Sequence, residues 1–134
     1  MRLSSFLFFV PLLIAPVIIY TLCTYTGALN IPLGDWQTIA GDQTVITSGM
    51  LITLLGSVCL LFELLKATTV GSRVMVDHTF SVLLLLGVTI SYVVVPGFGT
   101  ETFLLLVIFS LIDVIAGLVI SQATARRDIG FGVG

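Results

Sequence analysis

The sequence has very little charge. Only 9% of its 134 residues are Asp, Glu, Lys or Arg, whereas 57% are hydrophobic. A soluble domain averages about 25% charged residues. A water-soluble core in so short a chain cannot bury this much apolar surface. The composition therefore excludes an ordinary soluble domain and predicts an integral membrane protein.

The residues needed for common kinds of chemistry are also scarce. The chain has one histidine, and its two cysteines, Cys23 and Cys59, lack the spacing of a metal or redox motif. The sequence contains no nucleophile–base pair, metal-ligand cluster or phosphate-binding loop, and its five basic residues form no stripe. We therefore expect a non-enzymatic protein with no metal or cofactor, and one that does not bind nucleic acid.

The sequence contains four long apolar runs. They cover residues 5–26, 44–65, 76–95 and 101–122. Each is close to the ~20 residues that cross the hydrocarbon core of a bilayer as a helix. The first run is longer than the apolar part of a signal peptide and no small-residue cleavage site follows it, so we expect it to be retained. The prediction is one all-α domain over residues 1–134, an up-down bundle of four transmembrane helices with short loops.

Residues at the ends of these runs fit helix boundaries. Asp42 or Thr44 is placed to cap the second helix, and Asp77 to cap the third. Thr100 is placed to cap the fourth helix in the same way. The Pro-Gly pair at 96–97 should stop the third helix, because proline cannot continue it.

The basic residues predict an orientation. All of them fall before the first helix, between the second and third, or after the fourth: Arg2, Lys66, Arg73, Arg126 and Arg127. The positive-inside rule then places both termini in the cytoplasm. The loops on the other side carry Asp35, Asp42 and Glu101. We expect a multi-pass protein of a bacterial inner membrane.

The longer outer loop covers residues 27–43. Asp35 and Trp36, followed by Ile39 and Ala40, could form one turn of helix lying in the membrane interface. The alternative is an irregular loop in which Trp36 serves as an interfacial anchor.

Asp113 is a charged residue near the centre of the fourth apolar run. It lies roughly 18 Å along the helix from Glu101, and we expect no basic side chain at its depth. Ser110 on the same face and Ser57 on the second helix are its candidate polar neighbours. Without a cation the carboxyl group should carry a proton at neutral pH. One interpretation is a structural hydrogen bond between helices, and the other is a proton or cation site.

Small residues predict where the helices pack. Gly49, Thr53 and Gly56 share one face of the second helix. Small side chains at this spacing let helix backbones approach closely in lipid. The third and fourth helices offer Gly87, Ser91 and Gly117 for the same purpose. We expect these residues to serve packing and not a permeation path.

Two further features lie toward the cytoplasmic side. Glu63 and Lys66 are three residues apart, so they can form an ion pair while Lys66 extends toward the membrane surface. His78 has no second metal ligand nearby in the sequence, which favours a headgroup or capping contact over a proton-relay role.

These features predict a small accessory or scaffold subunit. With almost no soluble part, the chain has surface mainly for lipid and for other membrane helices, from another membrane protein or from a second copy. The alternative is a small oligomeric transporter or channel that uses Asp113 to bind a proton or cation.

Overall fold

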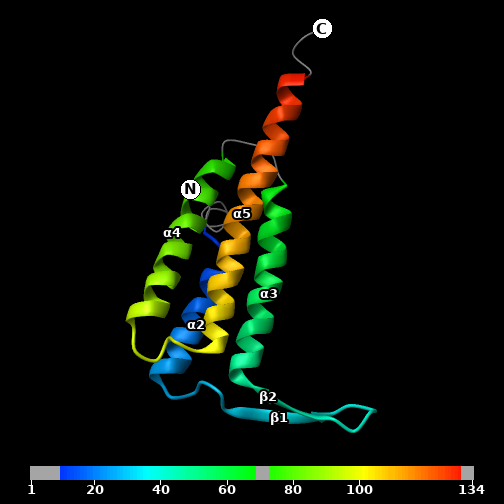
Figure 1. The fold of residues 1–134 in the computed structure, drawn as a ribbon, viewed down its shortest axis with the longest axis vertical. Coiled ribbons are helices and arrows are strands. Elements are labelled where there is room, and N and C mark those ends of the chain that lie inside the picture. Colours follow the sequence, from blue (N-terminus) through cyan, green and yellow to red (C-terminus); the bar gives the residue numbers. More distant parts are fainter. Residues whose placement is uncertain (1–9, 69–72, 131–134) are drawn as a thin grey trace, which may run out of the picture.

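The computed structural model of the chain describes residues 10–68 and 73–130. These residues form four helices and a two-stranded sheet (Figure 1). The order is α2 (Ile14–Tyr25), β1 (Pro32–Gln37), β2 (Gln43–Thr47), α3 (Ser48–Ala67), α4 (Arg73–Val94) and α5 (Glu101–Gly130). The described protein is mostly helical, as predicted, but the small sheet was not expected.

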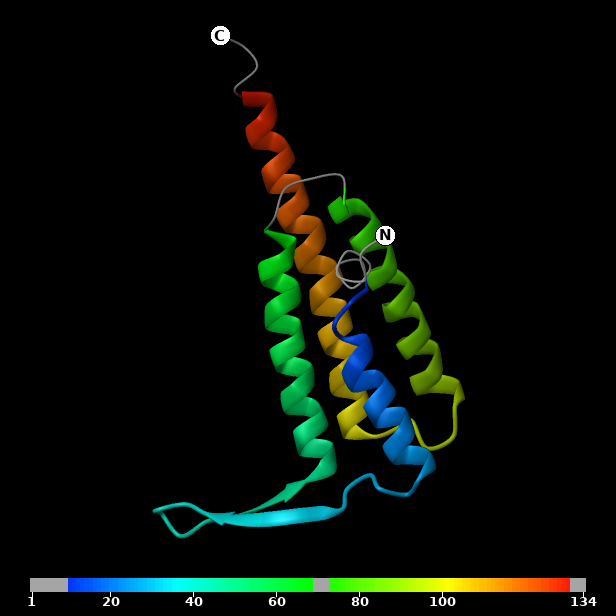
Figure 2. The same cartoon turned by 180° about the vertical axis from the view of Figure 1, so that it is seen from behind.

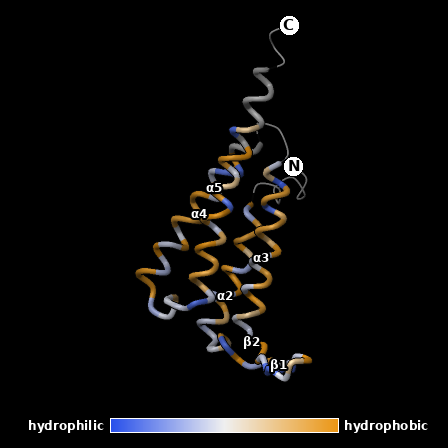
Figure 3. Tube along the Cα trace, turned by 45° about the vertical axis from the view of Figure 1, so that its right-hand side comes forward, coloured by the Kyte–Doolittle hydropathy of each residue, from blue (hydrophilic) through white to orange (hydrophobic). Residues whose placement is uncertain are grey.

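Three helical segments are long and apolar enough to cross a membrane: Ser48–Ala67, Val76–Val94 and Glu101–Ile120. Hydrophobic residues dominate the coloured parts of the helices (Figure 3). Helix α2 is apolar but has only 12 residues. The first span was predicted over residues 5–26, and residues 5–9 lie outside the described part of the chain.

Helix α5 is the centre of the bundle, because it contacts α2, α3 and α4. Figures 1 and 2 show α3 and α5 running in the same direction, with α2 and α4 running the opposite way. The two strands lie at one end of the bundle, which we call the hairpin end, and α5 extends beyond α3 at the other, which we call the far end (Figure 1).

An apolar core fills the half of the bundle nearest the hairpin end. Its buried residues come from α2, α3, α4, α5 and the turn before α5: Tyr20, Ile52, Val88, Phe98, Phe103 and Leu106. The Tyr20 ring packs edge-on against Phe98 and tilted against Phe103, with ring centroids 5.5 Å and 4.7 Å away. The Tyr20 hydroxyl lies 2.6 Å from Thr100 Oγ1 and donates to Gly97 O at 3.1 Å. This core ties α2 to the α4–α5 turn.

The loop between α2 and α3 contains a β-hairpin, so it is neither a turn of interfacial helix nor an irregular loop, and the role of Trp36 as an anchor stays a prediction. Strands β1 and β2 pair antiparallel, with Trp36 opposite Thr44 and Asp35 opposite Val45. Four of the five residues of β2, QTVIT, are β-branched, and such residues favour a strand over a helix end. Helix α3 consequently begins at Ser48, four residues later than predicted.

The first residues of α3 and α4 also correct the predicted caps. Thr47, and neither Asp42 nor Thr44, caps α3, because its side chain accepts a hydrogen bond from the Met50 amide. Helix α4 begins at Arg73, so Asp77 lies inside it and is not its cap.

The features predicted for the turn between α4 and α5 are confirmed, whereas the predicted end of α5 is wrong. Thr100 caps α5 by accepting a hydrogen bond from the Phe103 amide at 3.2 Å. Helix α4 ends at Val94, just before the Pro-Gly pair, and Gly97 has a positive φ of 86° that suits glycine. Helix α5 continues to Gly130, beyond the predicted limit at residue 122.

Candidate functional site

A cluster of polar side chains is buried between the helices toward the far end of the bundle. Asp113 on α5 is only 6% exposed and Glu63 on α3 only 2%. Around them lie one more residue of α3 and three of α4. We use the name polar cluster for the six residues Glu63, Lys66, Asp77, His78, Ser81 and Asp113.

Lys66 joins two helices within this cluster. Its Nζ lies 2.8 Å from Glu63 Oε2 on its own helix and 2.7 Å from Asp77 Oδ1 on α4. The predicted Glu63–Lys66 ion pair is therefore confirmed, but the Lys66 side chain is only 12% exposed and does not extend freely to the membrane surface. A lysine shared by two carboxylates holds α3 and α4 together.

Glu63 extends the network to the chain segment before α2. Its Oε1 accepts a hydrogen bond from the backbone N–H of Leu12. Leu12 lies just before Leu13, the N-cap residue of α2, and its part-buried N–H needs an acceptor from another part of the chain. Glu63 supplies that acceptor and ties α2 to α3.

Asp113 is the member of the polar cluster that comes from α5. Its carboxylate accepts a hydrogen bond from the Ser81 hydroxyl on α4, and it lies close enough to Lys66, Asp77 and His78 to interact with their charges. The expectation that no cation would lie at the depth of Asp113 is therefore wrong.

Lys66 lies near Asp113 because of the position of α3 relative to α5. Gly49 lies beside Thr102, and Gly56 beside Phe109. Since the two helices run in the same direction, the late start of α3 brings Lys66 closer to the level of Asp113. Helical side chains also point toward the N-terminus of their helix, which directs Lys66 back into the bundle.

His78 packs against α5 one turn beyond Asp113. A Cβ atom at Gly117 would lie 2.7 Å from His78 Nδ1, so glycine there makes room for the imidazole ring. His78 Nε2 is buried and has no hydrogen-bond partner among the described residues. The histidine therefore contributes to the polar cluster a buried nitrogen that has no partner among the described residues.

The two serines predicted beside Asp113 bond within their own helices. Ser110 is buried, and its hydroxyl donates to Leu106 O at 2.9 Å. Ser57 is exposed and donates to Leu54 O at 2.7 Å. The polar contact of Asp113 with another helix comes from Ser81, which the sequence analysis did not single out. Asp77 and Ser81 are four residues apart on one helix face, a spacing that could have indicated them.

Three of the small residues predicted for packing lie at helix contacts. Gly49 and Gly56 are buried on α3 against α5, and a Cβ at Gly56 would lie 2.9 Å from Leu106 Cδ2. Gly117 receives the His78 ring. Thr53 donates to Gly49 O at 3.1 Å. The remaining two, Gly87 and Ser91 on α4, differ from these, because a Cβ at Gly87 would meet no atom within 4 Å and Ser91 is partly exposed.

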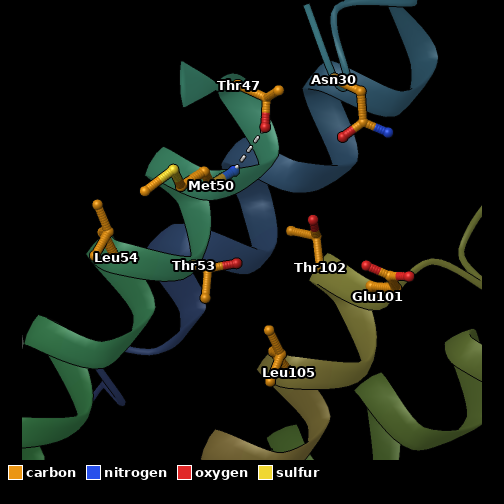
Figure 4. Close-up of a pocket in the computed structure, with 8 residues that line it drawn as sticks. All are labelled: Asn30, Thr47, Met50, Thr53, Leu54, Glu101, Thr102 and Leu105. Carbon is orange, nitrogen blue, oxygen red and sulfur yellow. Dashed lines mark hydrogen bonds between the residues drawn. The ribbon is translucent and has the colours of Figure 1, made fainter. Parts of the chain in front are cut away.

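A second feature is an open pocket at the hairpin end, between α3 and α5 (Figure 4). It has a volume of about 340 Å³ and is lined by Asn30, Thr47, Met50, Thr53, Leu54, Glu101, Thr102 and Leu105. Its location at the base of the hairpin, far along α5 from Asp113, separates it from the polar cluster.

The hairpin extends sideways from the bundle (Figures 1 and 2). Every residue of β1 is exposed, including Leu33 and Trp36 at 58% and 63%, and Ile39 in the connecting loop is fully exposed. Neighbouring residues of a strand point to opposite faces. The pairing therefore puts Trp36 and Ile46 on one face and Asp35 and Gln37 on the other.

Four of the five basic residues that predict the orientation lie in the described part of the chain. Arg2 lies outside the described residues. Arg73 is the first residue of α4, and Arg126 and Arg127 belong to the last turns of α5, at the far end. Lys66 lies in the polar cluster.

Comparison with known proteins gives no relative: no protein-family model, curated protein or solved structure matches the chain. Among the described residues, no group of three His, Cys, Asp or Glu side chains is placed to hold a metal ion.

Proposed function

We propose that the protein is a non-enzymatic accessory subunit that packs beside another integral membrane protein. The observation that carries this proposal is the exposed β-hairpin, which lies across one end of the bundle and reaches beyond it (Figure 1). In a membrane, the part of the hairpin that reaches beyond the bundle lies over whatever is next to the bundle, which is either lipid or a neighbouring protein.

The hairpin has little to stabilise it within this chain. An isolated two-stranded hairpin is marginally stable at best in water, and usually needs more strands or a packed face. Both faces of β1 are exposed here, and one face of the hairpin carries the apolar side chains of Trp36, which is exposed, and Ile46, which is partly exposed. A partner that covers this face would bury apolar area and stabilise the hairpin.

Charge indicates the chemistry of that partner. The sequence has no Lys or Arg between Arg2 and Lys66, whereas Asp35 and Asp42 lie in the hairpin. Glu101 lies at the same end of the bundle, at the start of α5. Complementary charge at an interface favours the right partner and speeds association. We propose a membrane protein that presents basic and apolar side chains at its outer surface.

Location and orientation are part of the same proposal. The protein spans a bacterial inner membrane with both termini in the cytoplasm, which the positions of the basic residues support. The hairpin would then lie on the outer side.

The test is site-specific photocrosslinking in the cells that make the protein. A photoreactive amino acid at position 39, in the hairpin loop, should crosslink one integral membrane protein with a basic outer surface. The same probe at position 90, on the exposed face of α4, is the positional control.

Variants at two neighbouring positions test which face of the hairpin contacts the partner. Trp36→Ala should reduce the crosslink at position 39 by at least about tenfold, because aromatic residues often dominate binding energy at interfaces. Gln37→Ala, on the opposite face, should leave it unchanged. Adducts only with lipid, or only with a second copy of the chain, would contradict the proposal.

A further inference from the structure

The polar cluster holds more negative than positive charge. Three carboxylates, Glu63, Asp77 and Asp113, share one lysine, Lys66. Uncompensated charge inside an apolar bundle is costly, because the surroundings cannot solvate it. Among the described side chains, the remaining negative charge of the cluster can therefore be balanced by protons or by a cation.

The carboxylates differ in what compensates them. Glu63 and Asp77 both lie within 2.8 Å of Lys66 Nζ. Asp113 has no ion pair among the described side chains, and its direct partner is the neutral hydroxyl of Ser81. Asp113 is therefore the carboxylate whose charge is least compensated.

A second polar side chain lies beside Asp113. His78 lies against Gly117, one turn along α5 from Asp113, and its Nε2 is buried without a partner in the described part of the chain. A ring nitrogen without a partner can still donate or accept a hydrogen bond, depending on the tautomer of the imidazole.

The cluster also has an exposed edge. The side chains of Lys66 and Asp77 are 12% and 16% exposed, whereas Asp113 is 6% exposed. Glu63 lies four residues before the end of α3, and Asp77 four residues after the start of α4. The partly exposed members of the cluster therefore lie on the side of the far end.

We propose that Asp113, Ser81 and His78 form a proton-binding site that opens toward the far end of the bundle. Asp113 takes up a proton from that side, Ser81 provides the hydrogen bond between α4 and α5, and the His78 ring packs against α5 beside them. This site is independent of the partner proposed for the hairpin. It would give the protein a proton-dependent state within the membrane.

The groups that face Asp113 come from all the helices packed around it. Helix α3 contributes Glu63 and Lys66, together with the buried Cys59 thiol beside Glu63, and α4 contributes Asp77 and His78. The segment before α2 contributes the Leu12 amide, which is uncharged and bound to Glu63. A pH titration must therefore distinguish the carboxyl signal of Asp113 from the signals of Glu63 and Asp77.

Infrared difference spectroscopy of the full chain in lipid nanodiscs provides this separation, because a protonated carboxyl group has its own C=O stretching band. Changing the pH should produce a carboxyl band that Asp113→Asn removes. Asp35→Asn, in the exposed hairpin, should leave the band in place. A band that is unchanged in Asp113→Asn, or an Asp113 band that does not respond to pH, would overturn the proposal.

A second pair of variants tests whether His78 belongs to the site. His78→Gln should move the midpoint of the Asp113 band by about one pH unit, since it replaces the imidazole ring that packs against α5 one turn from Asp113. Ser110→Ala should not move it, because that hydroxyl is bound within its own helix. An unchanged midpoint in His78→Gln would overturn the assignment of His78.

Sodium ions distinguish a proton site from a cation site. The midpoint of the Asp113 band should be the same in sodium and in choline chloride at equal ionic strength. A midpoint that shifts with sodium concentration would show competition by a cation and overturn the proposal. Circular dichroism and size-exclusion chromatography of each variant confirm that it is folded before it is titrated.

Discussion

Lys66 and Asp77 lie on different helices, and their charged groups are 2.7 Å apart within the bundle. Lys66 also pairs with Glu63, so one cation serves two carboxylates on two helices. Removing one partner of a buried ion pair leaves the other charge uncompensated. The stability of the α3–α4 contact should therefore depend on Lys66.

Lys66→Met should lower the free energy of unfolding by about 3 kcal/mol. The substitution keeps most of the side-chain volume but leaves Glu63 and Asp77 without their cation. Thermal unfolding in mild detergent measures the loss. The double variant Lys66→Met with Asp77→Asn should recover part of it, and an unfolding midpoint equal to that of the unmodified protein would refute the role of Lys66.

Two glycines offer a matched test of helix packing. Gly56→Leu should lower the free energy of unfolding by about 2 kcal/mol, because the new side chain has to displace Leu106 and Phe109. Gly87→Leu should have little effect, since a Cβ at Gly87 meets no atom within 4 Å. Equal unfolding midpoints for the two variants would contradict the packing of α3 against α5.

The Tyr20 hydroxyl should contribute to stability at the hairpin end. Tyr20→Phe keeps the ring contacts but removes the hydrogen bonds to Gly97 and Thr100, at a cost of about 1.5 kcal/mol. Tyr25→Phe is the control, because the Tyr25 side chain is 75% exposed. If both variants unfold at the temperature of the unmodified protein, the hydrogen bonds of Tyr20 contribute nothing measurable.

Asp113→Asn and Asp113→Leu separate hydrogen bonding from charge. Asparagine can still accept a hydrogen bond from Ser81, so the variant should fold and remain monodisperse in detergent. Leucine cannot, and it leaves the buried Ser81 hydroxyl without its Asp113 partner, so it should reduce stability by about 2 kcal/mol. Size-exclusion chromatography and thermal unfolding compare the two. An Asp113→Leu variant as stable as Asp113→Asn would argue against this contact.

Cysteine labelling tests the orientation. A cysteine at position 39, in a chain whose Cys23 and Cys59 are replaced by serine, should react with a membrane-impermeant maleimide in intact spheroplasts. A cysteine in place of Gly134 should react only after the membrane is opened. The opposite pattern would reverse the orientation that the positive-inside rule predicts.

The sequence alone indicates a membrane protein of several helices, because apolar runs of this length suit a bilayer regardless of their neighbours. It also predicts local features, such as the Thr100 cap and the end of α4 before Pro96, which depend on residues close together in the chain. The Glu63–Lys66 ion pair belongs to the same class, because three residues along a helix bring the side chains together.

The hairpin and the polar cluster required the tertiary structure. Residues 44–47 form either a strand or the start of a helix, and pairing with β1 decides between them. That choice moves the start of α3 by about one turn and so changes which residues face Asp113. Ser81, His78 and Lys66 come from other helices, and their contacts with α5 depend on helix register, which no local pattern in one helix specifies.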